Sequence, residues 1–460
     1  MSATTPTIST VWQCPQDNAL EAAQQFLAAH GVQFILAQFV DVHGGIKSKS
    51  VPVQCLPGLT TDGAGFAGGA ILGFDMSPQD PEFMMVADLN TLALMPWMPG
   101  YACIRGVGMV GDQPCEMDPR NVLLKQAERL SKRGLRLMTG LEPEFYLLKQ
   151  DDDGHISPFD STDTLERPTY DYRGLTRNAG FIEGLYGALT KVGLEVYQID
   201  HEDANGQFEI NFKYDEAVKS ADNMQFFKMA AKEIANNEGA ICSFIPKLSA
   251  TTTGNGMHVH CSLVNEAGDN VFHDASDPSD MGLSRMAYQF IAGVMAHAEA
   301  LAALLCPSVN SYKRLITGTP TAPSWAPVFI AYGDNNRSAM VRIPYGRIEV
   351  RIGDSSMNPY LATAAIIAAG LDGIDRELTP PEPQSLNFYD LTLQQVSELG
   401  VDRLPENLDL ALTALEQDSL LAEALGERLI TSFLKLKRQE WQDYHRSVSE
   451  WELQRYLTFY

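Results

Sequence analysis

Two glutamates, Glu142 and Glu144, stand at alternate positions of the apolar segment GLEPEFYLL. Alternate side chains of a β-strand point to the same face, so both carboxylates would face one way. Burying an unpaired carboxylate is strongly unfavourable, and a positive group must therefore lie opposite them. That group is either an arginine, which would make the pair structural, or a metal ion.

The same alternation recurs in two further apolar segments. NGMHVHCSL carries His258, His260 and Ser262 at alternate positions. RIEVRIG carries Glu349 and Arg351 in the same way. Strands with this pattern have one polar face and one packed face. Three such strands side by side would form a curved sheet with a charged concave lining.

A further acidic segment, HEDANGQFEINF, places Glu202 and Glu209 around a glycine turn. Taken alone, a Glu-x-Glu pair is more often a salt-bridged surface strand, and a His-x-His pair is usually solvated. Taken together, the acids and one imidazole form a ligand set that suits Mg²⁺ or Mn²⁺ rather than zinc or copper. The candidate metal ligands are Glu142, Glu144, Glu202, Glu209, His258 and Glu349.

Arginines cluster in the same part of the sequence as these acids. They are Arg314 in NSYKRL, Arg337 and Arg342 in NNRSAMVRIP, and Arg351 in RIEVR. Arginine binds carboxylates and phosphates with two parallel hydrogen bonds. Such a set would offset the negative charge of ATP and of a carboxylate substrate. The residues therefore favour a two-metal active site that uses a nucleotide.

The composition excludes several classes of function. The 460 residues are 45% hydrophobic and 20% charged, which is typical of a globular protein. A net charge of -24 argues against nucleic acid or an anionic membrane as the main partner. The 7 cysteines include no C-x-x-C, which indicates a reducing compartment. Without a signal-peptide pattern or a bilayer-length apolar segment, we expect a soluble cytoplasmic protein.

The order of elements predicts three parts. Residues 1–17 read as a flexible polar tail, and 18–117 as a small domain with a helix, a buried strand, a turn at FVDVHGG and a returning strand. An amphipathic helix should start at Asp118 and Pro119, an N-cap followed by proline, and we place the domain boundary there. Strands and helices alternate beyond it, and 380–460 is mostly helical. This order predicts an α+β fold with a large domain over 118–460.

These motifs resemble those of glutamine synthetase. GLEPEF, HEDANGQFE, TGNGMHVH, NSYKRL, NNRSAMVRIP, RIEVR and NPYLA occur in the order and approximate spacing of that family, over most of the chain from about Val32. The chain is most similar to the type III glutamate–ammonia ligases, which include γ-glutamylmethylamide synthetases. The resemblance implies an N-terminal β-grasp domain and a catalytic domain with a cup of curved antiparallel strands. It also implies ring-shaped homo-oligomers, usually dodecamers, with active sites between subunits.

The resemblance implies two cation sites. The ion nearer the substrate glutamate would be held by Glu144, Glu202 and Glu209. The ion that serves the ATP phosphates would be held by Glu142, His258 and Glu349.

Other residues match substrate-handling positions of the family. The arginines on the transferring phosphate would be Arg337 and Arg342, and the glutamate substrate would be held by Gly254, Arg314 and Arg351. The nucleotide side would be lined by Tyr214, His260 and Ser262. Asp41 of FVDVHGG, supplied by a neighbouring subunit, would bind the amine and help to deprotonate it. The implied reaction forms γ-glutamyl phosphate from L-glutamate and ATP, and an amine then displaces phosphate.

One departure from the family concerns the amine. Members carry a flap glutamate within a sequence such as P-G-x-E-A-P, whereas RLITGTPTAPSW, residues 314–325, contains no acidic residue. A less polar pocket favours an amine other than, or in addition to, ammonia. For methylamine, the extra methyl group contributes about 0.8 kcal/mol when it is buried.

Three alternatives remain open. The chain could be an ordinary glutamine synthetase with an altered flap, or a γ-glutamyl ligase for polyamines or ethanolamine, which product mass would distinguish. It could also be a non-catalytic ring protein with a structural or regulatory role, since a fold alone does not establish activity. The presence of every metal ligand and all four arginines argues against that reading.

Overall fold

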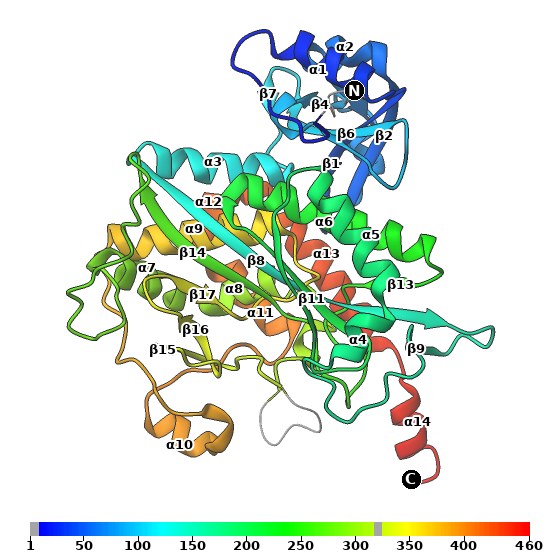
Figure 1. The fold of residues 1–460 in the computed structure, drawn as a ribbon. Coiled ribbons are helices and arrows are strands. Elements are labelled where there is room, and N and C mark those ends of the chain that lie inside the picture. The colour runs from blue at the N-terminus through cyan, green and yellow to red at the C-terminus, as the bar shows by residue number, and fades with distance from the viewer. Residues whose placement is uncertain (1–8, 317–323) are drawn as a thin grey trace, which may run out of the picture.

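The structure, a computed structural model, describes residues 9–316 and 324–460. A smaller sheet with two helices is formed by the N-terminal part of the chain, and a larger sheet backed by helices follows it (Figure 1). This arrangement confirms the α+β class. Residues 1–8 of the expected tail, and 317–323 of the segment that lacks the flap glutamate, lie outside the described residues.

The N-terminal sheet has the strand order β2-β1-β6-β4-β3, and both β5 and β7 pair with β6. Its helices are α1 (Ala19–Ala29) and α2 (Leu56–Thr61). Its strands are β1 (Phe34–Val40), β2 (Ile46–Pro52), β3 (Ala64–Phe66), β4 (Phe83–Ala87), β5 (Ala93–Leu94), β6 (Tyr101–Val110) and β7 (Gln113–Pro114).

The predicted turn at FVDVHGG joins two antiparallel strands, as expected. Val40 pairs with Ile46 at the end of the β1–β2 ladder. The chain reverses through Gly44, whose φ of 87° is a conformation that glycine adopts without strain. One residue of the expected tail is also fixed, because the indole N–H of Trp12 donates to the carbonyl of Leu89 at 2.7 Å.

The predicted helix start at Asp118 is confirmed. The helix α3 spans Pro119–Ser131, and the Asp118 side chain accepts a hydrogen bond from the backbone N–H of Arg120. That cap satisfies one of the donors that a helix N-terminus leaves unpaired. The covering helices of the larger part are α3, α4 (Tyr172–Arg177), α5 (Ala179–Lys191), α6 (Ala217–Asn237), α7 (Arg285–Ala296), α8 (Ala298–Leu305) and α9 (Pro359–Asp375).

The larger sheet has the order β10-β11-β8-β14-β17-β16-β15, with β9, β12 and β13 pairing with β8. Its neighbours are antiparallel except for the parallel pair β15–β16. The three predicted strands β8, β14 and β17 therefore lie side by side. Strand bounds are β8 (Leu135–Gln150), β9 (Ile156–Pro158), β10 (Val196–His201), β11 (Gln207–Phe212), β12 (Asp215–Glu216), β13 (Ile241–Ser243), β14 (Met257–Asn265), β15 (Phe329–Asp334), β16 (Ala339–Ile343) and β17 (Ile348–Val350).

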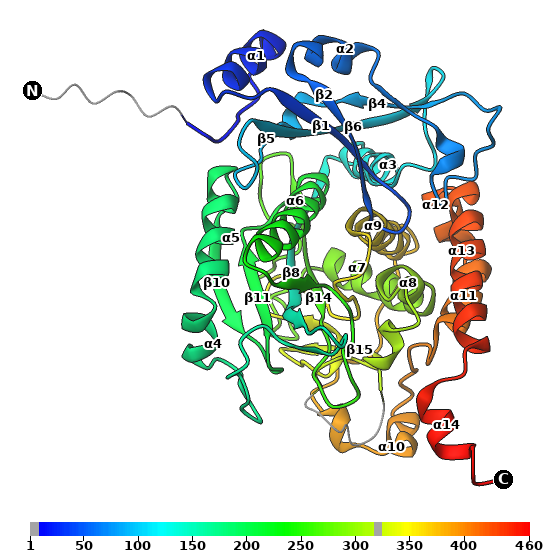
Figure 2. The same ribbon diagram turned by 90° about the vertical axis from the view of Figure 1, so that its right-hand side faces the viewer.

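The helices α3, α6 and α9 lie between the N-terminal sheet and the larger sheet (Figure 2). The helix α9 of this layer packs closely against α7. At the crossing of α7 and α9, a Cβ on Gly293 would lie 2.1 Å from the carbonyl of Ala369, so only glycine permits this approach. The chain ends in α10 (Leu393–Glu398), α11 (Leu408–Gln417), α12 (Ser419–Leu425), α13 (Glu427–Arg446) and α14 (Glu450–Tyr456).

Within the described residues, no single helix is long and apolar enough to cross a membrane. The pair α7 and α8 meets that length and composition only when taken together, and the two are bent by 75° at their junction.

Candidate active site

The register of the larger sheet sets the polar side chains in one row. Opposite Glu142 of β8 lies His258 of β14, and opposite His260 of β14 lies Glu349 of β17. On the other edge of β8, Glu144 pairs with Glu209 of β11. Directly opposed side chains of neighbouring strands lie about 5 Å apart on one face. The row therefore crosses four strands without a break.

Three trios in this row can each hold a cation. Their members are Glu142, His260 and Glu349; Glu142, Glu209 and His258; and Asp200, Glu202 and Glu209, and in each trio one ligand atom per residue lies within 4.8 Å of the others. Five of the six predicted ligands belong to a trio. Asp200 and His260 join them without having been predicted there. For Asp200 the signal was in the sequence, because it lies on β10 and stands two residues before Glu202, which follows the end of that strand.

Glu144 lies beside the trios and is held by the neighbouring backbone. Its carboxylate accepts the N–H of Gly256 at 2.8 Å and the side-chain N–H of Gln207 at 3.2 Å. The negative charge of Glu144 also acts on the neighbouring acids, since it raises the pKa of both Glu202 and Glu209. The structure thus brings Glu144 next to the acids with which it was grouped.

Among the residues that the structure describes, Asp200, Glu202 and Glu209 form no ion pair with a basic side chain. Burial, followed by the charges of Glu144, Asp203 and Asp200, raises the pKa of Glu202 to about 8. Burial and the neighbouring carboxylates likewise raise the pKa of Glu209 well above its ordinary value. A divalent cation with oxygen ligands would relieve this repulsion. The donor set therefore fits Mg²⁺ or Mn²⁺.

The acids near β14 and β17 are compensated within the chain. Burial opposes ionisation of Glu142, but hydrogen bonds from His258 and His260 outweigh it and lower the pKa of Glu142. The pKa of Glu349 is lowered against the same burial by the charges of His258 and Arg351. The two halves of the row thus differ in how much positive charge they still require.

Two of the predicted arginines, Arg342 and Arg351, pair with Glu349. Arg342 NH1 donates to the Glu349 carboxylate at 2.7 Å, and Arg351 NH1 donates to its other oxygen. Arg337 is exposed, and its charge lowers the pKa of Tyr170 against larger opposing effects.

Arg314, which was predicted to hold the substrate glutamate, is buried beside the other residues of that group. It is only 3% exposed, and its two terminal nitrogens donate to the carbonyls of Arg351, Ile352 and Gly353. These carbonyls lie at and after the end of the short strand β17, and the Gly353 carbonyl also accepts from the backbone N–H of Met257 at 3.0 Å. Gly254 lies against Arg314, and a Cβ on Gly254 would come within 2.8 Å of the arginine side chain.

A pocket of about 500 Å³ adjoins the row. It contains the three residues predicted for the nucleotide, Tyr214, His260 and Ser262. It also contains Tyr197 and Arg347, which the sequence reasoning missed. Arg347 is the first residue of RIEVR and stands two residues before Glu349, so the alternation along that segment could have found it. Tyr197 and Tyr214 are both more than half exposed and offer aromatic surface to a planar base.

Tyr170 is a further residue that the sequence reasoning missed. Its φ is 60°, a conformation that bulky side chains rarely adopt, and its backbone N–H donates to the carbonyl of His201 at 2.9 Å. Burial and then the charges of Glu202 and Asp200 raise the pKa of its hydroxyl. A strained aromatic residue at such a position is typical of a functional site.

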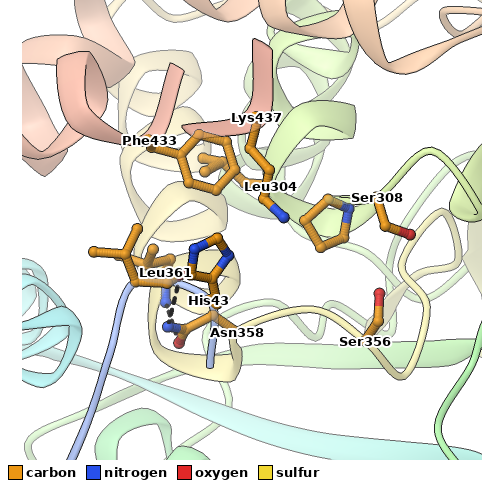
Figure 3. A pocket seen from close by; sticks show the side chains of 10 residues that line it. His43, Leu304, Ser308, Ser356, Asn358, Leu361, Phe433 and Lys437 are labelled. Atoms are coloured by element: carbon orange, nitrogen blue, oxygen red, sulfur yellow. Dashed lines mark hydrogen bonds between the residues drawn. The ribbon is translucent and has the colours of Figure 1, made fainter. Parts of the chain in front are cut away.

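Asp41 lies away from the trios of its own chain. Its carboxylate accepts the N–H of Gly45 at 2.8 Å and pairs with Lys47 at 3.0 Å. The side chain of Asn358 donates to the Asp41 carbonyl at 3.0 Å and fixes the loop on the start of α9. A cavity of about 180 Å³ lies beside this loop, with His43 and Lys437 pointing into it (Figure 3).

The chain is similar to proteins of known activity over nearly its whole length. A family model described as the glutamine synthetase catalytic domain matches residues 116–456. A glutamate–methylamine ligase of Methyloversatilis universalis is 51% identical over 440 residues, which cover 95% of this chain and 99% of the relative. A glutamine synthetase of Rhizobium meliloti is 39% identical over 434 residues, which cover 93% of this chain and 97% of the relative.

Solved structures agree with the sequence comparison. A GmaS–ADP complex superimposes with a TM-score of 0.88 at 38% identity, covering 95% of this chain and 99% of the other. A GmaS structure without ligand superimposes with a TM-score of 0.87 over the same shares.

Proposed function

Because the chain belongs to the glutamine synthetase family of ATP-dependent carbon–nitrogen ligases, we propose that it joins L-glutamate to methylamine to form γ-glutamylmethylamide. The observation that carries this proposal is the unbroken row of carboxylates and imidazoles across β11, β8, β14 and β17. The row occurs in a chain that is 51% identical to a glutamate–methylamine ligase.

The cations of this site are proposed to be Mg²⁺ or Mn²⁺. One would be held by Glu142, His258 and Glu349, and the other by Glu144, Glu202 and Glu209. When bound, they would supply positive charge against the ATP phosphates and the substrate carboxylate. His260 and Asp200 would lie next to these ligands, because both take part in the trios.

In the first step, a γ-carboxylate oxygen of glutamate attacks the γ-phosphorus of ATP, and the bond to ADP breaks. The side chains of Tyr214, His260 and Ser262 would orient the nucleotide in the 500 Å³ pocket. Arg337 and Arg342 would stabilise the charge on the transferring phosphoryl group. Arg351, held by Glu349, and the backbone at Gly254 would position the substrate glutamate.

In the second step, the amine attacks the γ-carbonyl of γ-glutamyl phosphate, and phosphate leaves with the former carboxylate oxygen. The amine arrives as a cation and must lose a proton first. Asp41 from a neighbouring subunit would bind the cation and accept that proton. In the isolated chain Asp41 is paired with Lys47, so the arriving ammonium group would take over a position that Lys47 occupies.

The proposal includes a ring-shaped homo-oligomer, a dodecamer as in the family. Two observations support it: Asp41 pairs away from the trios of its own chain, and the C-terminal segment exposes large apolar side chains. Leu457 is 74% exposed and Phe459 72%, which is the kind of surface that another subunit covers. We also propose 18–117 as a β-grasp domain, 118–460 as the catalytic domain, and the cytoplasm as the compartment, since all 7 cysteines are free.

The test is phosphate release with ATP, Mg²⁺ and L-glutamate, compared among methylamine, ethylamine, ethanolamine, a diamine and ammonium, with the product identified by mass. We expect release that requires an amine and is fastest with methylamine. The matched control is Glu209→Gln, which removes one charge from the row and should abolish release with every amine. Equal or faster turnover with ammonium would contradict the proposed amine.

A further inference from the structure

An exposed indole is fixed at the edge of the site. Trp325 is 53% exposed, although large aromatic side chains are usually well covered. Its indole N–H donates to Asp203 at 3.1 Å, and its carbonyl accepts from Arg351 at 3.4 Å. Tyr389 packs against it edge-on, with ring centroids 6.5 Å apart and planes at 84°. These contacts hold the ring in one orientation while leaving much of its surface open.

The contacts of Trp325 place it across the row of acids. Asp203 directly follows Glu202 in the sequence. Its carboxylate accepts a hydrogen bond from the hydroxyl of Thr169, which directly precedes Tyr170. Arg351, on the opposite side, pairs with Glu349. Trp325 therefore connects the acid-rich end of the row, near β10, through its indole with the arginine-rich end, near β17, through its backbone carbonyl.

Recognition of an alkylammonium ion needs more than carboxylates. Ammonium and methylammonium carry the same charge, so the acids of the row attract both. Only a surface that contacts the methyl group can distinguish them. The face of an aromatic ring attracts the cation and also removes the methyl group from water. Trp is the side chain that does this best.

We propose that Trp325 contacts the methyl group of methylammonium and gives the site its preference over ammonium. This inference rests on the proposed function and names the side chain that selects the amine. The sequence around it agrees. In SWAP, residues 324–327, Trp325 stands directly before Ala-Pro, as the glutamate does in P-G-x-E-A-P.

The test compares Trp325→Ala with Trp325→Phe in the full-length protein. Without the ring, we expect the KM for methylamine to rise about tenfold or more, since both the cation–π contact and the methyl burial are lost. The KM values for ammonium, ATP and L-glutamate should change less than about twofold to threefold, as expected when no methyl contact is involved. Trp325→Phe keeps an aromatic face but loses the bond to Asp203, and it should retain most of the preference.

Binding gives a second readout. Titration of methylammonium should quench the tryptophan fluorescence of the wild-type protein, and Trp325→Phe should lose that change. The matched control is Tyr186→Ala, because Tyr186 is 48% exposed on the distant helix α5, and this variant should keep the wild-type amine preference.

The outcomes separate this inference from the proposed function. If the wild-type protein turns over methylamine and Trp325→Ala raises the KM values for methylamine and ammonium equally, Trp325 is structural and the inference is wrong. If the wild-type protein does not use methylamine at all, the proposed function is wrong, and the inference fails with it.

Discussion

The two glutamates of GLEPEF have different surroundings at the scale of single residues. Glu142 accepts from two imidazoles, whereas Glu144 accepts from the N–H of Gly256 and from Gln207. Both carboxylates face one way, as strand geometry requires. The positive charge opposite the acids is therefore unevenly distributed. Histidines and arginines pair with Glu142 and Glu349, whereas the acids near β10 and β11 require a bound cation.

The repulsion among the acids near β10 and β11 predicts how the stability of the metal-free protein depends on pH. The pKa of Glu202 rises from 4.5 to about 8 on folding, so the folded state holds a proton that the unfolded state releases. This contribution to stability is complete below pH 4.5 and is lost as the pH rises through 8. We expect the Tm without metal to fall between pH 5 and 8, and Mg²⁺ to restore it most strongly at pH 8.

The control is Glu202→Gln, which cannot ionise. At pH 8 without metal this variant should be more stable than the wild type by on the order of 2 kcal/mol, because the repulsion among the acids is reduced. Mg²⁺ should then stabilise it much less. A wild-type Tm that rises from pH 5 to 8 without metal, with no difference between the two proteins, would contradict this account of the acids.

Glu349 predicts a second effect at this scale. It is fully buried and accepts from both Arg342 and Arg351. Glu349→Gln should lower the affinity for Mn²⁺ by tenfold or more, because one ligand charge is lost. It should also destabilise the protein by about 3 kcal/mol, since two arginines lose their partner. Titration calorimetry and urea unfolding measure the two effects. Glu195→Gln, which removes only an exposed pair with Lys213, should change neither.

At the scale of elements, the sequence indicated the strands but not their register. The alternation around Glu142, His258 and Glu349 predicted three neighbouring strands, and β8, β14 and β17 confirm it. Which acid meets which imidazole depends on the pairing of strands far apart in sequence, and no local pattern encodes that. For the same reason the trio role of His260 could not be assigned.

Residues outside the strands were harder to predict. Arg314 follows a motif, but its partners are carbonyls after β17 that only the folded chain brings within reach. Tyr170 and Trp325 lie on loops without periodicity, and their positions follow from a left-handed backbone and from the bond to Asp203. Sequence patterns therefore predicted which polar side chains the strands bring together and missed those that loops add beside them.

The junction of α7 and α8 carries a pH-dependent contact. His297 lies between Asp418 at 2.5 Å and Asp372 at 3.2 Å, and each side chain is 11% exposed. Burial opposes the charged imidazole, but hydrogen bonds and charges from Asp418 and then Asp372 raise its pKa above 6.5. Its contribution to stability is therefore complete below pH 6.5 and is lost as the pH rises through the raised value.

We expect His297→Gln to lower stability by about 2 kcal/mol at pH 6, because two charge-assisted hydrogen bonds are lost. The difference from the wild type should shrink at pH 9, where the wild-type imidazole is neutral. Urea unfolding at the two pH values measures this. Arg376, which also pairs with Asp372, remains in the variant and keeps that carboxylate compensated. An equal difference at both pH values would contradict a charged His297.

At the scale of the whole molecule, one buried arginine connects the N-terminal sheet with the helices beneath it. Arg120 of α3 donates to Asp222 of α6 and to Asp88, which follows β4. Tyr360 of α9 donates to the same Asp222 at 2.6 Å. Removal of a buried partner leaves an uncompensated charge, which costs several kcal/mol.

Arg120→Ala should therefore destabilise the protein by about 3–5 kcal/mol. It should also separate the unfolding of the N-terminal part from that of the larger part in a calorimetric scan. Arg133→Ala is the matched control, because Arg133 lies just beyond the end of α3 and pairs with Asp375 at the surface. This variant should change the free energy of unfolding by less than about 1 kcal/mol. A single sharp transition with unchanged Tm in Arg120→Ala would contradict this role.

The most direct test of the central claim is a competition between equal concentrations of methylammonium and ammonium. The reaction contains ATP, Mg²⁺ and L-glutamate labelled with ¹⁸O in its γ-carboxylate, and mass spectrometry measures both amides and the released phosphate. We predict that γ-glutamylmethylamide is the main product and that the phosphate carries one labelled oxygen. Glutamine as the main product, or phosphate without label, would contradict methylamine ligation through γ-glutamyl phosphate.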